Sequence, residues 1–221
     1  MPIPKILLAQ FCENNFFHVF CKSIDERKLF TNNDNRALFL QRFNYFLTPF
    51  VNTYGYSLLP NHAHFLIKPN STKSIINFLN ECDPDLLTHT HRKFIESDQI
   101  TTYHELIEQQ FNRFFISYAL KYNIQQKQNG HLFLRPFKRK PVNDDLHLTQ
   151  LMIYIHANPV KHKIIKDLTY YKWSSYQALL SDSPTHLCRE EVLNWFGGKE
   201  NFIRVHHEQT LHYYNHPDAM E

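Results

Sequence analysis

A short apolar stretch with two histidines, residues 58–67, most constrains how this chain can fold. It reads Leu-Leu-Pro-Asn-His-Ala-His-Phe-Leu-Ile, so histidines and apolar residues alternate from His62 onward. Side chains two apart on a strand point to the same face, and the alternation therefore predicts a strand with His62 and His64 on one face. Pro60 and Asn61 before them are typical of a turn, which places the histidines at the start of that strand. Two imidazoles placed in this way can converge on one divalent cation.

The His-x-His pattern is a weak signal by itself. The chain has 15 histidines among 221 residues, and about one such pair is expected by chance in a chain of this composition. A second pair, His89 and His91, lies in a polar stretch without strand character and serves as an internal control. The apolar strand around His62 and His64 favours a rigid metal site. Two polar residues on the wet face of an edge strand remain an alternative.

Composition excludes several classes of function. Glycine occurs only 4 times, and neither a P-loop nor a G-x-G-x-x-G motif is present, so no nucleotide cofactor is expected. The 4 cysteines include no C-x-x-C pair, which argues against a zinc site and against a disulfide framework. No apolar run approaches the roughly 18 residues of a membrane span, so we expect a cytoplasmic protein without membrane contact. The formal charge of +3 is compatible with a nucleic-acid partner.

The order of the predicted elements favours an α+β fold. Strands or extended segments are expected at residues 16–24, 54–59, 62–68 and 132–142. Helices are expected at residues 37–50, 71–79, 103–122 and 145–157. This order is that of a ferredoxin-like split βαβ, an antiparallel sheet with helices on one face.

The chain is expected to divide near Ser181–Pro184. Residues 1–181 would form the sheet domain, and residues 182–221 a small helical C-terminal extension broken at Gly197 and Gly198. The polar segment 82–99 stays unassigned.

A predicted helix at residues 145–157 carries the other informative motif. An apolar stripe runs along it, formed by Leu148, Leu151, Met152 and Ile155. Tyr154 and Asn158, four residues apart, lie together on a neighbouring face. Asn158-Pro159 is expected to end the helix, because the residue before a proline avoids helical geometry. On the pattern alone, Tyr154 is most simply an aromatic at the edge of the core and Asn158 a helix stop.

These motifs together resemble a known family, the single-tyrosine HUH transposases, and most closely the REP-associated tyrosine transposases. Residues 60–67 resemble the signature P-N-H-x-H-x-L-I, and residues 154–160, Tyr-Ile-His-Ala-Asn-Pro-Val, resemble Y-I-H-x-N-P-V. The likeness extends to Gly-His-Leu-Phe at 130–133 and to Trp-Ser-Ser-Tyr at 173–176, in the order of the family. It covers most of residues 14–180.

The resemblance implies a metal-dependent single-strand DNA endonuclease and strand transferase that acts on hairpin-containing DNA. Tyr154 would be the nucleophile and form a 5′-phosphotyrosine, while His62, His64 and Asn158 would bind Mg²⁺ or Mn²⁺. Such a linkage conserves the energy of the broken phosphodiester, which fits the missing nucleotide loop. Two imidazoles and an amide oxygen suit these ions less obviously than carboxylates do, so phosphate and water must supply further oxygens.

Basic residues on both sides of the tyrosine are candidates for contacts with single-stranded or hairpin DNA. They are Arg135, Lys138, Arg139, Lys140, Lys161 and Lys163. Phe133 and Phe137 interleave with the first of these and suit base stacking. For any single lysine, a solvated strand edge is an equal explanation. The sequence is compatible with a monomer or a homodimer.

Two other functions stay open from the sequence. A domesticated protein that binds DNA hairpins without cutting them would be free to lose Tyr154 and the metal ligands, whereas this chain has the full set. A metal-dependent hydrolase of small phosphoesters would turn over without DNA and without Tyr154. A cleavage assay with a hairpin oligonucleotide separates the three functions.

Overall fold

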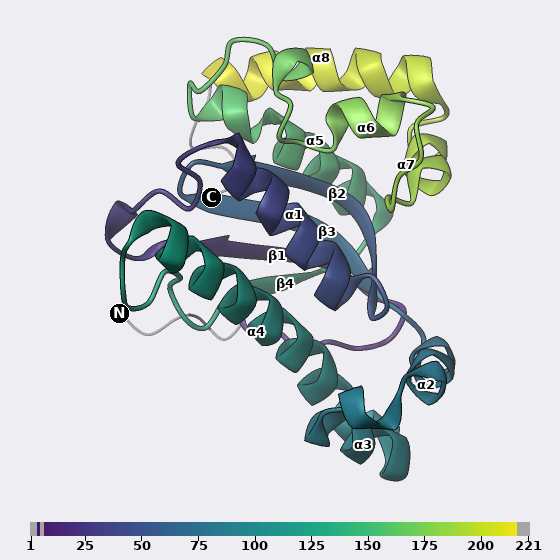
Figure 1. Ribbon diagram of the computed structural model, residues 1–221. Helices are drawn as coiled ribbons and strands as arrows, with labels where there is room; N and C mark the ends of the chain where they lie inside the picture. Colours follow the sequence, from purple (N-terminus) through teal and green to yellow (C-terminus); the bar gives the residue numbers. More distant parts are fainter. Residues whose placement is uncertain (1–3, 5–6, 216–221) are drawn as a thin grey trace.

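Within the residues that the computed structural model describes, Pro4 and 7–215, a four-stranded antiparallel sheet forms the centre (Figure 1). Its strands are β1 (Phe16–Lys22), β2 (Val51–Leu59), β3 (His62–Pro69) and β4 (Lys138–Val142). They lie in the order β2-β3-β1-β4, and each neighbouring pair is antiparallel. Helix α1 (Asn33–Leu47) connects β1 to β2, and α4 (Gln99–Gln126) lies between β3 and β4. The predicted α+β, ferredoxin-like order of elements is therefore confirmed.

Helices α1 and α4 cover one face of the sheet with a core of phenylalanines. Phe65 of β3 stacks on Phe43 of α1 with 4.4 Å between ring centroids, and Phe39 meets Phe114 of α4 at 4.8 Å. Figure 1 shows the two helices side by side across this face. Aromatic pairs of this kind add to the free energy gained from apolar burial. The alternation of β3 thus directs Phe65 into the core and leaves His62 and His64 to the other face.

The polar segment 82–99, unassigned from the sequence, is mostly helical. After α2 (Thr72–Glu81) come a short turn of 3-10 helix, η3 (Pro84–Leu86), and α3 (His89–Glu96), which packs on α4. In α3, the backbone N–H of Thr88 donates to Nδ1 of His91. The amide of Gln110 lies 2.9 Å from Nε2 of His91, so both ring nitrogens of this histidine have structural partners.

Helix α5 (Asp145–Lys161) lies on the histidine face of the sheet, against β2 and β3. Helices therefore cover both faces of the sheet, whereas the sequence predicted them on one face. The prediction that this helix ends at Asn158-Pro159 is wrong, because the helix runs through Pro159 to Lys161. A proline so close to the end removes few helical hydrogen bonds, and burial of Val160 in the last turn offsets the cost. The added turn brings Lys161 onto the helix face that carries Tyr154.

The C-terminal helices pack on the outer side of α5. They are η4 (Leu168–Tyr170), α6 (Tyr176–Leu180), α7 (Arg189–Trp195) and α8 (Lys199–Asn215). The predicted break at Gly197 and Gly198 is confirmed, and both glycines have positive φ. An apolar cluster, called here the α5 core, joins sheet, α5 and α8 and includes Tyr54, Leu66, Met152, Ile155 and Phe202.

Residues 182–215 of the predicted extension therefore share a core with the sheet domain, and residues 216–221 lie outside the described part. No helix in the described part of the chain is long and apolar enough to span a membrane.

Candidate active site

Histidines from two strands meet the tyrosine of α5 on the face of the sheet that α5 covers. His62 and His64 lie on β3, and His18 lies beside them on β1. The ring of His64 is 5.1 Å from those of His62 and His18 and 5.9 Å from that of Tyr154, measured between centroids. We call His18, His62 and His64 the histidine cluster. The structure thus brings together the two motifs that the sequence places far apart.

Asn61 orients the ring of His62. Its side-chain Oδ1 lies 2.7 Å from Nδ1 of His62. An amide oxygen can only accept, so the hydrogen of this imidazole sits on Nδ1 and Nε2 keeps its lone pair. A lone pair on Nε2 is the form that binds a metal ion.

His64 has a histidine as its partner. Nε2 of His18 lies 2.9 Å from Nδ1 of His64, and both side chains are buried. The local sequence predicts neither the order of the strands in the sheet nor the pairing of β1 with β3. For this reason His18 was not among the predicted site residues. The only available signal was strand alternation in residues 16–22, which places His18 and Phe20 on one face.

The histidine cluster is held in its uncharged form. Burial lowers the pKa of His18 and of His62 to about 3, and nearby positive groups act in the same direction. Burial also holds the pKa of His64 well below its usual value. Neutral imidazoles are the state required of metal ligands, because a protonated ring has no lone pair to donate.

Asn158 presents an unpaired acceptor one helical turn after Tyr154. Its Nδ2 donates to the carbonyl of Tyr154 at 3.0 Å, whereas its buried Oδ1 has no hydrogen-bond partner. A buried oxygen without a partner is costly, so its presence calls for an explanation. Asn158 follows Tyr154 by four residues in α5, so helical periodicity places both side chains on the same side of the helix. A bound cation would satisfy this oxygen.

The side chains present can accommodate a divalent cation, although only with an amide ligand. No three His, Cys, Asp or Glu side chains in the described part of the chain are grouped as a metal site. A cation at this place would have to be held by the neutral imidazoles of His62 and His64 and by the unpaired oxygen of Asn158. Such a set leaves room for oxygens from phosphate and water.

Lys161 and His162 complete the surroundings of the site from the end of α5. The ammonium of Lys161 lies 5.2 Å from the ring centroid of Tyr154, and its side chain is only 6% exposed. The ring of His162 is 5.0 Å from that of His62. Lys161 was predicted as a surface contact for DNA, but the extra helical turn places it beside the tyrosine. His162 was not predicted, because the helix was expected to end before it.

The basic segment before α5 divides between the two faces of the sheet. Lys140 pairs with His18 across β1 and β4, and Lys138 pairs with Phe20, so these two lysines border the histidine cluster. The ammonium of Lys138 lies 5.6 Å from the half-buried ring of Phe20. Exposed Lys22 flanks His62 across β1 and β3.

Arg139 points to the opposite face and is buried there. Its guanidinium lies 2.8 Å from a carboxylate oxygen of Glu108 and donates through Nε to the carbonyl of Ala9 at 2.6 Å. These contacts take Arg139 out of the predicted DNA surface. Phe133 and Phe137, predicted as stacking aromatics, are also buried, because they pack in the core beneath α4.

Two further predicted cations are exposed but lie at different places. Arg135 lines a pocket of about 150 Å³ that Ile116 and Leu120 of α4 also border. It therefore lies on the α4 side of the sheet. Lys163 follows the end of α5 and is exposed, directly after His162, whose ring lies 5.0 Å from that of His62.

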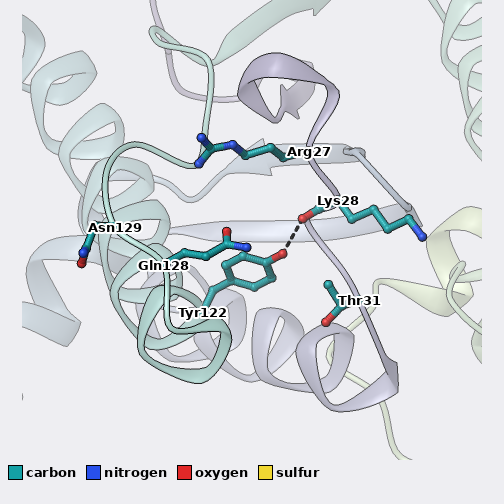
Figure 2. A pocket seen from close by; sticks show the side chains of 6 residues that line it. All are labelled: Arg27, Lys28, Thr31, Tyr122, Gln128 and Asn129. Carbon is teal, nitrogen blue, oxygen red and sulfur yellow. Dashed lines mark hydrogen bonds between the residues drawn. The ribbon is translucent and has the colours of Figure 1, made fainter.

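Another pocket, of about 510 Å³, lies outside the histidine cluster (Figure 2). The residues that line it are Arg27, Lys28, Thr31, Tyr122, Gln128 and Asn129. The hydroxyl of Tyr122 donates to the backbone carbonyl of Lys28 at 2.7 Å, as the dashed line in Figure 2 shows. The lining includes neither the histidine cluster nor Tyr154 nor Asn158, so this pocket is separate from the candidate active site.

Comparison with known proteins gives one structural likeness and no match in sequence. No protein-family model matches the chain, and no curated protein matches it significantly. The fold is similar to the solved structure of a REP-associated tyrosine transposase bound to a REP hairpin, with a TM-score of 0.49 and 13% identity. The alignment covers 83% of this chain and 89% of that chain. At this score and identity, the roles of individual side chains have to come from the geometry of the present chain.

Proposed function

We propose that this protein is a single-strand DNA endonuclease and strand transferase that acts on hairpin-containing DNA through Tyr154. The observation that carries the proposal is the contact of Tyr154 with His64, at 5.9 Å between ring centroids. His62 lies 5.1 Å from His64, and the unpaired oxygen of Asn158 belongs to the residue one helical turn after Tyr154. A nucleophile beside neutral metal ligands is the arrangement needed for phosphodiester transfer.

In the proposed reaction, the hydroxyl oxygen of Tyr154 loses its proton and attacks the scissile phosphorus. A bond forms between that oxygen and phosphorus, and the bond from phosphorus to the 3′ oxygen breaks. The departing 3′ oxygen takes up one proton, so that overall the proton lost by tyrosine is balanced. His62, His64 and Asn158 would hold Mg²⁺ or Mn²⁺, which when bound supplies positive charge to the phosphate oxygens. Lys161 places further positive charge beside the ring that carries the attacking oxygen.

The polarity of the product is the one that the family resemblance implies, and in-line attack is its geometric requirement. Tyrosine oxygen and leaving 3′ oxygen must lie on opposite sides of the phosphorus. The protein then retains the 5′ phosphate as a phosphotyrosine, and the other strand leaves with a free 3′ hydroxyl. Attack by that hydroxyl on the phosphotyrosine would rejoin DNA without a nucleotide cofactor.

The DNA strand would approach along the histidine face beside β1 and β4. Lys138, Lys140 and exposed Lys22 border this face and can neutralise phosphates. Phe20 lies between them, with its ring 4.8 Å from His18 and 5.7 Å from His64. A half-buried aromatic ring next to lysines is suited to stacking with an unpaired base.

The test uses hairpin oligonucleotides with single-stranded flanks, taken from repeated hairpins near the gene and labelled at one end or the other. Each is incubated with the protein and Mg²⁺ or Mn²⁺ and separated under denaturing conditions. The 3′-labelled strand should shift to a protein-linked species, and the 5′-labelled strand should appear as a short free product.

Other outcomes contradict the proposal in different ways. A 3′-phosphotyrosine would be shown by the reverse pattern of labels. Tight binding of hairpins with no cleavage under any metal would indicate a DNA-binding protein without nuclease activity. Cleavage without any adduct would indicate that water is the nucleophile.

A further inference from the structure

The contact between His18 and His64 has no role in the chemistry described so far. Nε2 of His18 and Nδ1 of His64 are 2.9 Å apart, and the rings lie 21° from parallel with 5.1 Å between centroids. Antiparallel pairing holds them there, because His18 pairs with Leu66 and Phe20 with His64 across β1 and β3. The strand pairing therefore fixes the positions of both residues in the sheet.

The hydrogen can occupy this contact in two ways. If Nδ1–H of His64 donates to Nε2 of His18, the lone pair of His64 is on its Nε2. If Nε2–H of His18 donates instead, His64 carries its hydrogen on Nε2 and that nitrogen cannot bind a metal. The first arrangement requires an acceptor at Nε2 of His18.

The neighbouring ligand has the same arrangement with a different partner. Asn61 accepts from Nδ1 of His62 and leaves its Nε2 with a lone pair. Nε2 of His18 faces Nδ1 of His64 in the same way as Oδ1 of Asn61 faces Nδ1 of His62. Such partners of metal-binding histidines fix the ring and its tautomer, and their loss typically weakens metal affinity by about 10- to 100-fold.

We infer that His18 is a positioning residue that holds His64 in the tautomer and orientation that bind the divalent cation. This inference rests on the metal site of the proposed function. It assigns a role to a residue of β1, outside both motifs that suggested that function. A purely structural histidine would support folding but would leave metal affinity unchanged.

The other buried histidine pair shows what a purely structural contact looks like. In His206, Nδ1 lies 2.8 Å from the carbonyl of Phe202 and Nε2 lies 2.9 Å from Nδ1 of His156. Nε2 of His156 in turn lies 2.7 Å from Oγ of Ser175. The carbonyl can only accept, so every hydrogen in this chain of contacts is determined and all four ring nitrogens are engaged.

Binding of Mn²⁺ to the full-length protein without DNA tests the inference, measured by calorimetry and by the electron paramagnetic resonance of free Mn²⁺. His18→Leu should bind Mn²⁺ about 10- to 100-fold more weakly. His18→Gln should stay within about threefold of the unchanged protein, because Oε1 of glutamine is as many bonds from Cα as Nε2 of histidine and can accept from His64. His18→Asn has a shorter reach and should bind as weakly as His18→Leu.

Controls separate this inference from the metal site itself. His91→Leu removes a histidine of similar burial on α3 and should leave Mn²⁺ affinity unchanged. His62→Ala combined with His64→Ala should abolish binding. If His18→Leu does not fold, the Mn²⁺ affinities of His18→Gln and His18→Asn still test whether an acceptor must reach His64.

The outcomes differ according to which idea fails. If the unchanged protein, His18→Leu and His18→Asn bind Mn²⁺ with equal affinity, the role of His18 is overturned. The metal site itself still stands in that case, provided that loss of both His62 and His64 abolishes Mn²⁺ binding. Mn²⁺ binding that survives loss of both His62 and His64 would overturn the metal site and this inference together.

Discussion

His64 and Tyr154 meet edge to face, with ring centroids 5.9 Å apart and ring planes at 87°. One residue belongs to β3 and the other to α5, so their contact depends on how α5 docks on the sheet. That docking rests on the α5 core, in which Met152 and Ile155 are fully buried on the same helix. Mutations in this core are therefore expected to affect the site as well as stability.

Replacing Tyr154 with phenylalanine tests the nucleophile. Only the hydroxyl is removed, so the free energy of unfolding should change by about 1 kcal/mol or less. Binding of hairpin DNA should persist, while the protein-linked product in a denaturing gel should vanish. A variant that still forms the adduct at the normal rate would exclude Tyr154 as the attacking residue.

The two His-x-His pairs provide a test with a built-in control. His62→Ala with His64→Ala should remove metal-dependent cleavage, because both imidazole ligands are lost. His89→Ala with His91→Ala should keep cleavage, although stability should fall by about 1–3 kcal/mol through the lost contacts of His91. Cleavage rates and urea unfolding measure the two effects. Equal loss of activity in both variants would remove the distinction between the pairs.

Local periodicity was enough to predict most of the fold. The strand of residues 62–69 and the apolar stripe of α5 depend on side chains two or four residues apart, which the sequence states directly. The pairing of β3 with β1 depends on residues far apart in the chain. For this reason His64 was predicted as a ligand while its partner His18 was not.

The errors have the same physical origin. Strand alternation already separates Arg139 from Lys138 and Lys140, but which face borders α5 is decided by packing. Likewise, Pro159 disfavours helix locally, and burial of the last turn of α5 overrides that preference. A local interpretation of the sequence placed Lys161 on the surface, whereas the structure places it beside Tyr154.

Gly55 of β2 is expected to be necessary for close docking of α5. A Cβ atom at this position would lie 2.7 Å from Sδ of Met152 and 3.3 Å from Oγ of Ser175. Gly55→Ala should cost about 1–2 kcal/mol of stability through overpacking, and Met152→Ala about 2–5 kcal/mol through the cavity that it leaves.

Urea unfolding of the two single variants and the double variant measures the coupling. The double variant should lose at least about 0.5 kcal/mol less than the sum of the single losses, because the smaller side chain makes room for the added methyl. Strict additivity would show that Met152 is not what the methyl group meets.

The buried pair His156 and His206 should make the fold sensitive to acid. Burial lowers the pKa of His206 to about 3, and that of His156 lies well below its usual value. The unfolded chain binds protons near pH 6.5 and the folded chain does not, so stability falls as pH falls from about 6.5 toward 3. At pH 5, His206 alone would have cost about 2 kcal/mol relative to neutral pH, and His156 acts in the same direction.

His206→Phe should weaken this dependence. At pH 7.5 the variant should be less stable by about 1–3 kcal/mol, because Nδ1–H of His156 loses its acceptor. Its stability should then fall less steeply between pH 6.5 and 5, by up to about 1.4 kcal/mol per pH unit. His89→Gln, at an exposed position on α3, should leave the slope unchanged. Parallel curves for all three proteins in urea unfolding would contradict the assignment.

The salt dependence of DNA binding should distinguish the lysines of β4 from the arginine between them. Lys138 and Lys140 border the histidine cluster, whereas Arg139 is buried against Glu108 on the opposite face. Each phosphate contact to a single strand adds about 0.7 to the slope of log affinity against log salt concentration. Lys138→Gln with Lys140→Gln should therefore flatten the slope by about 1.4.

Arg139→Met is the control for the two lysine substitutions, because it also removes one positive charge per substituted residue. It should lower stability in urea, because Glu108 loses its partner and the carbonyl of Ala9 loses its donor. Its salt slope should match that of the unchanged protein, measured by fluorescence anisotropy of a labelled hairpin between 50 and 200 mM salt, a range of about fourfold. A slope that flattens for Arg139→Met and not for the lysine pair would move the DNA to the α4 side of the sheet, beside Arg135.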